Sequence, residues 1–349
     1  MTQSDDKNSP LDAFRATRRK MIRLSAEELV GTDYLDSVRQ FPLVMRPNTE
    51  DLDLPQWAAD NRADLERALG KHGAILFRGF GLRSAPEFER FIGAVSGEAL
   101  AYNERSSPRS RITGQIYTST DHPPDKQIFL HNEQSYNLVF PMKIFFFCFQ
   151  AAAGGGATPI ADTRRVFERI SDEIRERFMK RKYRYVRNFG DGFGLSWQEA
   201  FQTEQRSEVE NYCRNNRIEY QWKPGNRLRT EQVREVATRH PKTGEWVWFN
   251  HLTFFHFGTL DRQTQEALTN SFVEEDLPNN TYYGDGARIE DGVMDYLRET
   301  YEKEKVRFDW EGGDLLMVDN MLASHGRDPY TGERRVLVGM AEPTSWDKI

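Results

Sequence analysis

The chain contains 349 residues, which is enough for one large domain or two and for a substantial hydrophobic core. Charged residues make up 29% of the sequence and hydrophobic residues 38%, as in ordinary soluble globular proteins. The formal net charge of −6 argues against a nucleic-acid partner and against binding to an anionic membrane. With only two cysteines, Cys148 and Cys213, we expect no disulfide framework and a reducing, cytoplasmic location.

The first part of the chain predicts a tail followed by helices around one short strand. Residues 1–12 are polar, lack the apolar core of a signal peptide, and are expected to form a disordered tail. Hydrophobic periodicity then predicts a basic helix over 14–29, an amphipathic helix over 57–71, a strand over 74–77 and a helix over 85–95.

The rest of the chain is richer in strands. A nearly continuous apolar run over 143–149 predicts a strand that is covered on both faces. A glycine turn at 154–156 and a helix over 164–180 follow, and the polar, turn-rich segment of about 188–229 is predicted to be an insertion. Further strands are predicted at 246–250, 306–308, 315–318 and 336–340. Without a repeat or a linker, residues 1–349 are interpreted as a single domain.

His131, Glu133 and His325 are the most informative residues of the sequence. With 7 histidines and 54 acidic residues among 349, about one His-x-Asp/Glu match is expected by chance, so the pair alone carries little weight. Two histidines and a carboxylate together can bind one face of an Fe(II) ion and leave the opposite face open. If the first two residues lie in an extended segment, their side chains point to the same side.

His325 comes from a distant part of the chain, so the site must form when the fold closes. A small β-barrel or jelly roll provides that geometry. We therefore predict a mainly β protein with flanking helices (α+β) and a double-stranded β-helix, or jelly-roll, core.

Several motifs in order resemble the taurine dioxygenase family of Fe(II)/2-oxoglutarate-dependent oxygenases. The resemblance runs from about Ala74 to Met340. It is carried by the strand motif at 73–80, His131-x-Glu133, the segment Gly155-Gly-Ala-Thr158, the stretches 240–244 and 248–250, and His325 followed by Arg334-Arg335.

The resemblance implies a role for each matching residue. His131, Glu133 and His325 would bind Fe(II), Thr158 would hydrogen-bond the co-substrate 2-oxoglutarate, and Arg335 would pair with its distal carboxylate. An arginine suits this task because its guanidinium group binds a carboxylate through two parallel hydrogen bonds. Arg334 is the competing candidate, and Arg335 is preferred because the family pattern uses the second arginine of such a pair.

Two departures from the family pattern are informative. The acidic residue of the metal motif is Glu133, which argues against a halogenase, because a halogenase needs that position vacated for halide. Four residues after Arg335 the chain has Gly339, where sulfonate-binding relatives have an arginine. A taurine-like substrate is therefore not expected.

Segments at 103–109, 116–120 and 131–136 resemble the syringomycin-type aspartate hydroxylases, which act on amino acids held by a carrier protein. This resemblance implies hydroxylation of an unactivated C–H bond of an amino-acid unit in natural-product (antibiotic) biosynthesis, with Fe(II), 2-oxoglutarate and O₂. Candidate substrate contacts are Asn103, Arg105, Gln134 and Asn250, each of which could instead be structural.

Other interpretations of the sequence stay open. The same chemistry could act on a free small acid or amino acid, with desaturation or cyclisation as the outcome, or the chain could be a non-catalytic β-barrel binding protein. The basic stretch 175–187 could be a solvated surface or a docking patch for an acidic peptidyl carrier protein. His251 and His256 lie in an aromatic run and are expected to be packed histidines rather than metal ligands.

Overall fold

The computed structural model describes residues 29–97, 111–119, 122–190, 192 and 194–349. The predicted tail at 1–12 and all but the last residue of the predicted basic helix lie outside these described residues, so neither prediction is tested. In the described part of the chain, no helix has both the length and the apolar character that crossing a bilayer would require.

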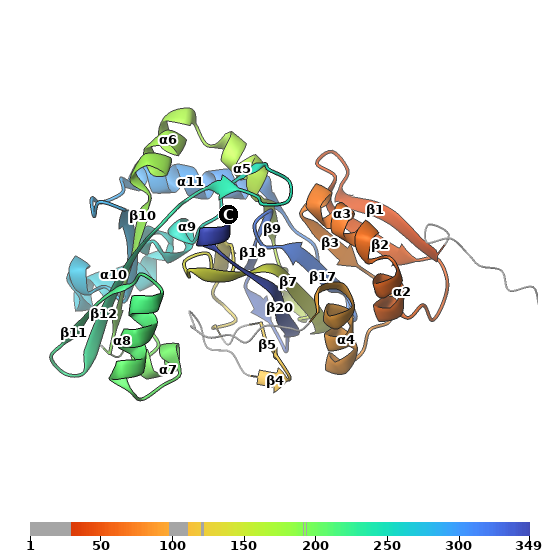
Figure 1. Cartoon of the computed structure of the whole chain (residues 1–349), viewed down its shortest axis with the longest axis horizontal. Coiled ribbons are helices and arrows are strands. Elements are labelled where there is room, and N and C mark those ends of the chain that lie inside the picture. Colours follow the sequence, from red (N-terminus) through yellow and green to blue (C-terminus); the bar gives the residue numbers. More distant parts are fainter. Residues whose placement is uncertain (1–28, 98–110, 120–121, 191, 193) are drawn as a thin grey trace, which may run out of the picture.

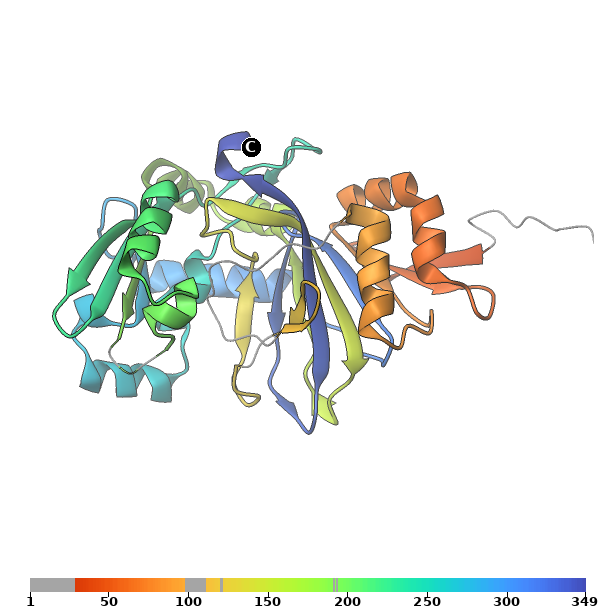
Figure 2. The same cartoon turned by 60° about the horizontal axis from the view of Figure 1, so that its bottom comes forward.

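The largest sheet has eight strands (Figure 1). All neighbouring strands are antiparallel except one parallel pair, β2 with β3. In spatial order the strands are β1 (Val30–Asp36), β2 (Phe41–Pro47), β3 (Ala74–Phe77), β17 (Leu315–Asp319), β7 (Val139–Gln150), β20 (Arg335–Ser345), β5 (Ile116–Thr118) and β4 (Arg111–Thr113). The long pair β7 and β20 runs through the centre of the molecule (Figure 2).

A second, four-stranded antiparallel sheet shares a core with the first. Its order is β16 (Lys305–Val306), β9 (Ile160–Asp162), β18 (Ala323–Arg327) and β6 (Ile128–His131). Ile144 and Phe146 of the large sheet pack in one buried cluster with Ile160 and Ala323 of the small sheet. The two sheets therefore enclose a common hydrophobic interior.

The opposite face of the large sheet is covered by three helices, α2 (Leu54–Asp60), α3 (Arg62–His72) and α4 (Ala85–Ser96) (Figure 1). On this side Phe145 and Phe147 of β7 pack against Phe91 and Phe88 of α4. Because the middle of β7 is buried on both faces, its sequence from Ile144 to Phe149 is continuously apolar instead of alternating.

A third sheet, the distal sheet, lies on the side away from α2–α4 (Figures 1 and 2). Its strands are β11 (Glu219–Lys223), β12 (Arg227–Arg234), β10 (Tyr183–Phe189) and β15 (Asn279–Tyr283). Two helices, α7 (Trp197–Phe201) and α8 (Arg206–Asn215), lie between β10 and β11 in sequence. The segment predicted as an insertion, about 188–229, thus begins and ends inside strands of one sheet.

The remaining elements connect these sheets. They comprise the helices α5 (Thr163–Arg169), α6 (Asp172–Arg181), α9 (Leu252–Phe255), α10 (Arg262–Ser271) and α11 (Asp291–Glu304), the 3₁₀ turns η2 (Phe257–Thr259), η3 (Glu274–Asp276) and η4 (Trp346–Lys348), and two short strand pairs, β8 (Gly154–Gly155) with β19 (Tyr330–Thr331) and β13 (Thr238–Arg239) with β14 (Trp246–Val247).

The predicted elements are largely present, but two predicted helices are divided. The strand at 74–77 and the helix at 85–95 are confirmed. The helix predicted over 57–71 is broken at Asn61, whose side-chain amide donates to Trp57 O (2.8 Å) and closes α2. The helix predicted over 164–180 is likewise interrupted between α5 and α6, and the strand predicted over 246–250 ends at Val247.

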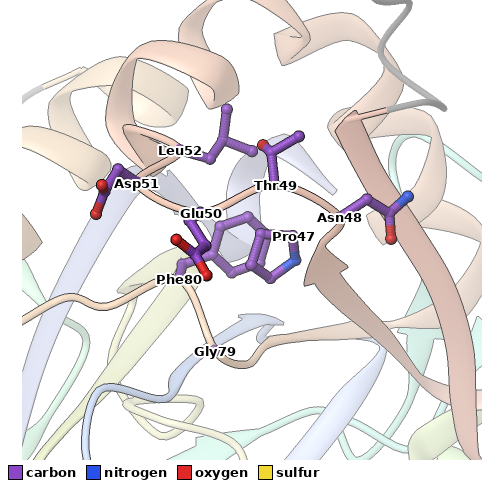
Figure 3. Close-up of a pocket in the computed structure, with 8 residues that line it drawn as sticks. All are labelled: Pro47, Asn48, Thr49, Glu50, Asp51, Leu52, Gly79 and Phe80. Carbon is purple, nitrogen blue, oxygen red and sulfur yellow. The ribbon is translucent and has the colours of Figure 1, made fainter.

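A hollow of about 290 Å³ lies beside the helical layer, between the loop after β2 and the loop after β3. Figure 3 shows the ring of Phe80 at its centre with Pro47 beside it, and the carboxylates of Glu50 and Asp51 at its rim. Its described lining contains none of the residues that the sequence marks for metal or co-substrate binding.

Candidate metal centre and anion pocket

The structure brings His131, Glu133 and His325 together. His131 is the last residue of β6 and pairs in register with His325 of the neighbouring strand β18. One possible ligand atom from each of the three residues lies within 4.8 Å of the others, and all three side chains are buried. Two imidazoles and one carboxylate from one side of a centre are a suitable donor set for Fe(II).

Glu133 does not lie in a strand, contrary to the extended geometry considered from the sequence. β6 ends at His131, and the following residues form a turn. The backbone of Glu133 is held instead by the side chain of Asn320, whose Oδ1 accepts from Glu133 N (2.8 Å) and whose Nδ2 donates to Glu133 O (2.9 Å). The carboxylate therefore reaches the centre through a tertiary contact, not through strand alternation.

Hydrogen bonding and ring packing fix the orientation of the two histidines. Nδ1 of His131 lies 2.8 Å from Phe129 O, which leaves Nε2 to face the centre. The ring of His131 packs on Phe254 (4.6 Å between centroids), and the ring of His325 packs on Phe146 (5.0 Å). These aromatic rings cover one side of the centre with apolar surface.

The aromatic rings around the centre come from β7 and α9. Phe145 and Phe147 of β7 face the helical layer, whereas Phe146 between them faces His325. Phe254 of α9 packs on the ring of His131. In a strand that is apolar on both faces, composition does not reveal which residues point inward.

His251 packs beside the centre. Its ring lies 5.0 Å from that of His131, and its Nδ1 is 2.8 Å from Ser135 Oγ, which donates to Asn132 O (3.0 Å). Burial, followed by the nearby histidines, lowers the pKa of His251 well below its usual 6.5, so its ring is neutral at pH 7. His256 is also packed, and its Nδ1 accepts from Gly258 N.

A second polar cluster lies where the pairing of β8 with β19 brings Thr158 close to Arg334. The guanidinium of Arg334 donates to Thr158 Oγ1 (3.3 Å), to Gly156 O (3.0 Å) and to Ser119 Oγ (3.3 Å). Thr158 Oγ1 also accepts from Trp310 Nε1 (3.0 Å). We call this group of residues the anion pocket.

The glycine turn before Thr158 is required by this close approach. Gly155 has a φ of +70°, and a Cβ there would lie 2.4 Å from Pro329 O. Only glycine adopts this backbone conformation at little cost and leaves room for the neighbouring strand.

The anion pocket is electropositive. Burial, followed by the positive charge of nearby Arg327, lowers the pKa of Arg334 to about 10. Arg327 itself is buried, and its guanidinium donates to the carbonyl of His122 (2.8 Å). A half-buried cation, Arg334, next to a buried one, Arg327, favours an anionic ligand, because an anion would offset both the repulsion and the lost hydration.

Arg335 lies apart from the anion pocket. It is the exposed first residue of β20, and its guanidinium lies over the ring of Phe149 (5.4 Å). Consecutive residues of an extended segment point to opposite sides, so only one of the two adjacent arginines can face Thr158, and that residue is Arg334. The structure thus does not bring Arg335, the arginine preferred from the sequence, to the site.

The same alternation changes the interpretation of Gly339. A Cβ at Gly339 would lie 2.4 Å from Ile92 of α4, so this position faces the helical layer and not the interior. Four residues after Arg334 stands Val338, which is buried in the interior cluster. The interior position is therefore apolar and carries no cation for a sulfonate.

The candidate substrate residues are placed in different surroundings. Gln134 is buried, has a left-handed backbone (φ 54°), and its Nε2 lies 3.6 Å from Met340 Sδ. Asn250 uses both ends of its amide on the backbone, donating to Val236 O and accepting from Leu252 N. Asn103 and Arg105 lie outside the described residues.

Most of the basic stretch 175–187 is paired with acidic side chains. The salt bridges are Arg175–Asp172, Arg177–Glu173, Arg177–Glu290, Arg181–Asp285, Lys182–Glu235 and Arg184–Glu231. The guanidinium of Arg187 is buried over the ring of Phe189. The local excess of positive charge that motivated a carrier docking patch is thus largely neutralised within the fold.

Asn320, Trp310 and Ser119 were not identified from the sequence. Each acts on a residue far away in the chain, and each belongs to a type that is common at structural positions. No spacing in the sequence connects them to the histidines or to Thr158.

Comparisons with known proteins agree with this geometry. Residues 38–341 match the family model described as "Taurine catabolism dioxygenase TauD, TfdA family". The chain is 43% identical over 279 residues to the dapdiamide synthesis protein DdaC of Enterobacter agglomerans, covering 80% of this chain and 85% of that protein. It is 27% identical over 324 residues to a clavaminate synthase-like protein of Arabidopsis thaliana, covering 87% and 94%.

Solved structures show the same fold at low sequence identity. The PvcB protein of Pseudomonas aeruginosa aligns with a TM-score of 0.53 and 17% identity over 91% of this chain and 93% of its own. AAD-2 in complex with Mn(II) and N-oxalylglycine aligns with a TM-score of 0.53 and 13% identity, covering 90% and 98%.

Proposed function

The chain belongs to the TauD, TfdA family and is an Fe(II)- and 2-oxoglutarate-dependent dioxygenase; from this premise we propose that it hydroxylates an unactivated C–H bond of an amino-acid unit in natural-product biosynthesis. The observation that carries the proposal is the buried group His131, Glu133 and His325, and the anion pocket formed around Arg334 and Thr158 supports it. The 43% identity to a dapdiamide synthesis protein supports the biosynthetic setting.

We propose that His131, Glu133 and His325 hold the iron. When bound, iron and 2-oxoglutarate supply the activation of O₂, with one oxygen atom entering the product and the other entering succinate as CO₂ is released. The protein's own contribution is to present three ligands from one side and to leave the opposite side accessible. Phe146 and Phe254 keep water away from the histidine rings.

We propose Arg334, in place of Arg335, as the arginine that binds the distal carboxylate of 2-oxoglutarate. Arg334 is hydrogen-bonded to Thr158, is half-buried and lies near the buried cation Arg327. A forked pair of charge-assisted hydrogen bonds to a carboxylate would stabilise its charge. Thr158 keeps the co-substrate role inferred for it from the sequence, and Trp310 fixes the position of its hydroxyl oxygen.

The arrangement of the two facing sheets supports a proposal about the core of the fold. The eight-stranded and four-stranded sheets enclose one hydrophobic interior, and the candidate ligands lie at its edge. We propose that this pair of sheets is the double-stranded β-helix core and that residues 29–349 work as a single oxygenase domain. The predicted tail at 1–12 is left outside this proposal.

Of the substrate candidates, Gln134 has the strongest support. It directly follows Glu133, its backbone is held in a left-handed conformation that is unfavourable for glutamine, and its amide contacts only a methionine sulfur among the described residues. We propose that this amide contacts the polar part of the amino-acid substrate. Asn250 is assigned a structural role because its amide is used by the backbone.

The test is to incubate iron-loaded enzyme with 2-oxoglutarate, O₂ and a panel of amino acids, each offered free and tethered to a carrier protein. Succinate and product mass are measured together. A gain of one oxygen with stoichiometric succinate supports the proposal. Whether the free or the tethered amino acid gains the oxygen shows whether a carrier protein is needed. A product that has lost two hydrogens would instead establish desaturation or cyclisation, and absence of Fe(II) binding would overturn the enzyme assignment.

A further inference from the structure

We propose that Asn320 is a positioning residue that sets the metal affinity of the centre by taking the place of a strand partner for Glu133. This inference rests on the proposed metal centre and extends it to a residue that makes no contact with the metal. Asn320 lies in the turn between β17 and β18 and is fully buried.

The need for such a residue follows from the end of β6. His131 is paired with β18, but the chain leaves the ladder directly afterwards, so the backbone N–H and C=O of Glu133 have no strand opposite them. Buried backbone polar groups require partners. The carboxamide of Asn320 carries one acceptor and two donor hydrogens, as a peptide group carries one acceptor and one donor, and it binds both backbone groups of Glu133.

The remaining hydrogen bonds fix Asn320 itself. Its Nδ2 also donates to Pro141 O (2.8 Å), and its backbone N–H donates to Met142 O (2.8 Å), so β7 holds it from one side. Its carbonyl accepts from Asn132 Nδ2 (2.7 Å), which adds a bond to the residue between the two proposed ligands. The turn 132–133 is thereby fixed to the start of β18, the strand that carries His325.

The preceding residue makes the turn rigid. Asp319 Oδ1 accepts from the backbone N–H groups of Met321 (3.0 Å) and Leu322 (3.1 Å), and Asp319 Oδ2 lies 3.1 Å from His240 Nε2. Asn320 is thus held in one position before any metal binds. A carboxylate that is fixed in place by its neighbours loses less freedom on binding a metal, and outer-shell partners of this kind typically change metal affinity by about 10–100-fold.

The experiment compares Asn320→Ala with a matched control, Asn188→Ala, by titrating the purified protein with Co(II) and following visible absorption. Asn188 is also buried, and its Nδ2 donates to two carbonyls, those of Glu275 (2.9 Å) and Leu277 (2.8 Å), but it lies in the distal sheet. Thermal unfolding of the metal-free proteins is measured in parallel.

We expect Asn320→Ala to raise the Kd for Co(II) by about 10–100-fold and to change the absorption bands that report ligand geometry, while Asn188→Ala lowers thermal stability without changing Kd or spectrum. If Asn320→Ala does not fold, Asn320→Ser is used, because its shorter side chain cannot reach both backbone groups of Glu133. Wild-type affinity and spectrum in the folded Asn320 variant would overturn the inference. Failure of the wild-type protein to bind Co(II) or Fe(II) would overturn the metal centre itself.

Discussion

The candidate metal centre and the charged surface along α6 and β10 use polar residues in opposite ways. At the candidate metal centre, buried side chains such as Asn320 and Asn132 bind the backbone and hold a few polar groups in place. Along β10 and α6, exposed charges such as Arg181 and Asp285 bind each other. The first arrangement fixes the position of candidate ligands, whereas the second neutralises most of the positive charge of the basic stretch 175–187.

The comparison predicts its largest effect at the histidines. His131→Ala is expected to weaken Fe(II) binding by more than about 100-fold and to abolish iron-dependent succinate formation, because a lost ligand costs more than a lost outer-shell partner. Metal titration and succinate assay measure the two effects. The control is His72→Gln, a buried histidine whose Nδ1 contacts Gln40 O far from the centre; equal losses in both variants would contradict the assignment.

The next largest effect is expected from substitution of Arg334, compared with its neighbour Arg335. Arg334→Met should raise the KM for 2-oxoglutarate by about 10–100-fold, since charge-assisted hydrogen bonds contribute about 1.5–3 kcal/mol. Arg335→Met should change it by no more than about twofold, because this side chain is exposed over Phe149. Steady-state kinetics with varied 2-oxoglutarate distinguishes the two, and a larger effect at Arg335 would restore the preference based on the sequence.

The next prediction concerns how the stability of the protein depends on pH through His256, a buried histidine that is not a candidate ligand. Burial, followed by the charge of Arg298, lowers the pKa of His256 to about 4 from 6.5. A histidine with a depressed folded pKa contributes stability that is present above pH 6.5 and is lost as the pH falls towards 4. This loss is about 3 kcal/mol in the free energy of unfolding.

His256→Gln should therefore flatten the pH dependence of denaturant unfolding between pH 6.5 and 4, since glutamine keeps an acceptor for Gly258 N but does not titrate. An unchanged slope would show that other groups control stability in this range. Burial also lowers the pKa of His72, so the pH dependence of unfolding is compared with that of the variant His72→Gln.

The smallest effect is expected at the charged surface along α6. Arg181→Ala removes an exposed pair with Asp285 and should lower the free energy of unfolding by less than about 1 kcal/mol, as surface ion pairs usually do. Combined charge reversal at Lys180, Arg181 and Lys182 should leave Fe(II) binding unchanged. Reduced turnover of a carrier-tethered substrate in that triple variant would revive the docking patch; turnover equal to wild type would remove it.

The sequence by itself determined the chemistry and much of the local structure. His131, Glu133 and His325 could be proposed as iron ligands because two imidazoles and a carboxylate suit Fe(II) and because the motifs around them resemble one family. The structure brings the three side chains together. The strand at 74–77 and the helix at 85–95 could be placed because local periodicity and capping residues are sufficient there. Thr158 was proposed because the segment Gly155–Thr158 resembles a family motif, and the structure places its hydroxyl next to Arg334.

Only the tertiary structure decided which neighbouring residue faces the site. The side chains that face the interior are those of Arg334, Phe146 and Val338, and not those of Arg335, Phe145 and Gly339. The members of each pair are adjacent in an extended segment, where a shift of one position reverses the face. Where both faces of a strand are buried, hydrophobicity does not distinguish them. Asn320 follows Glu133 by 187 residues in the sequence, so the two residues meet only after the chain has folded.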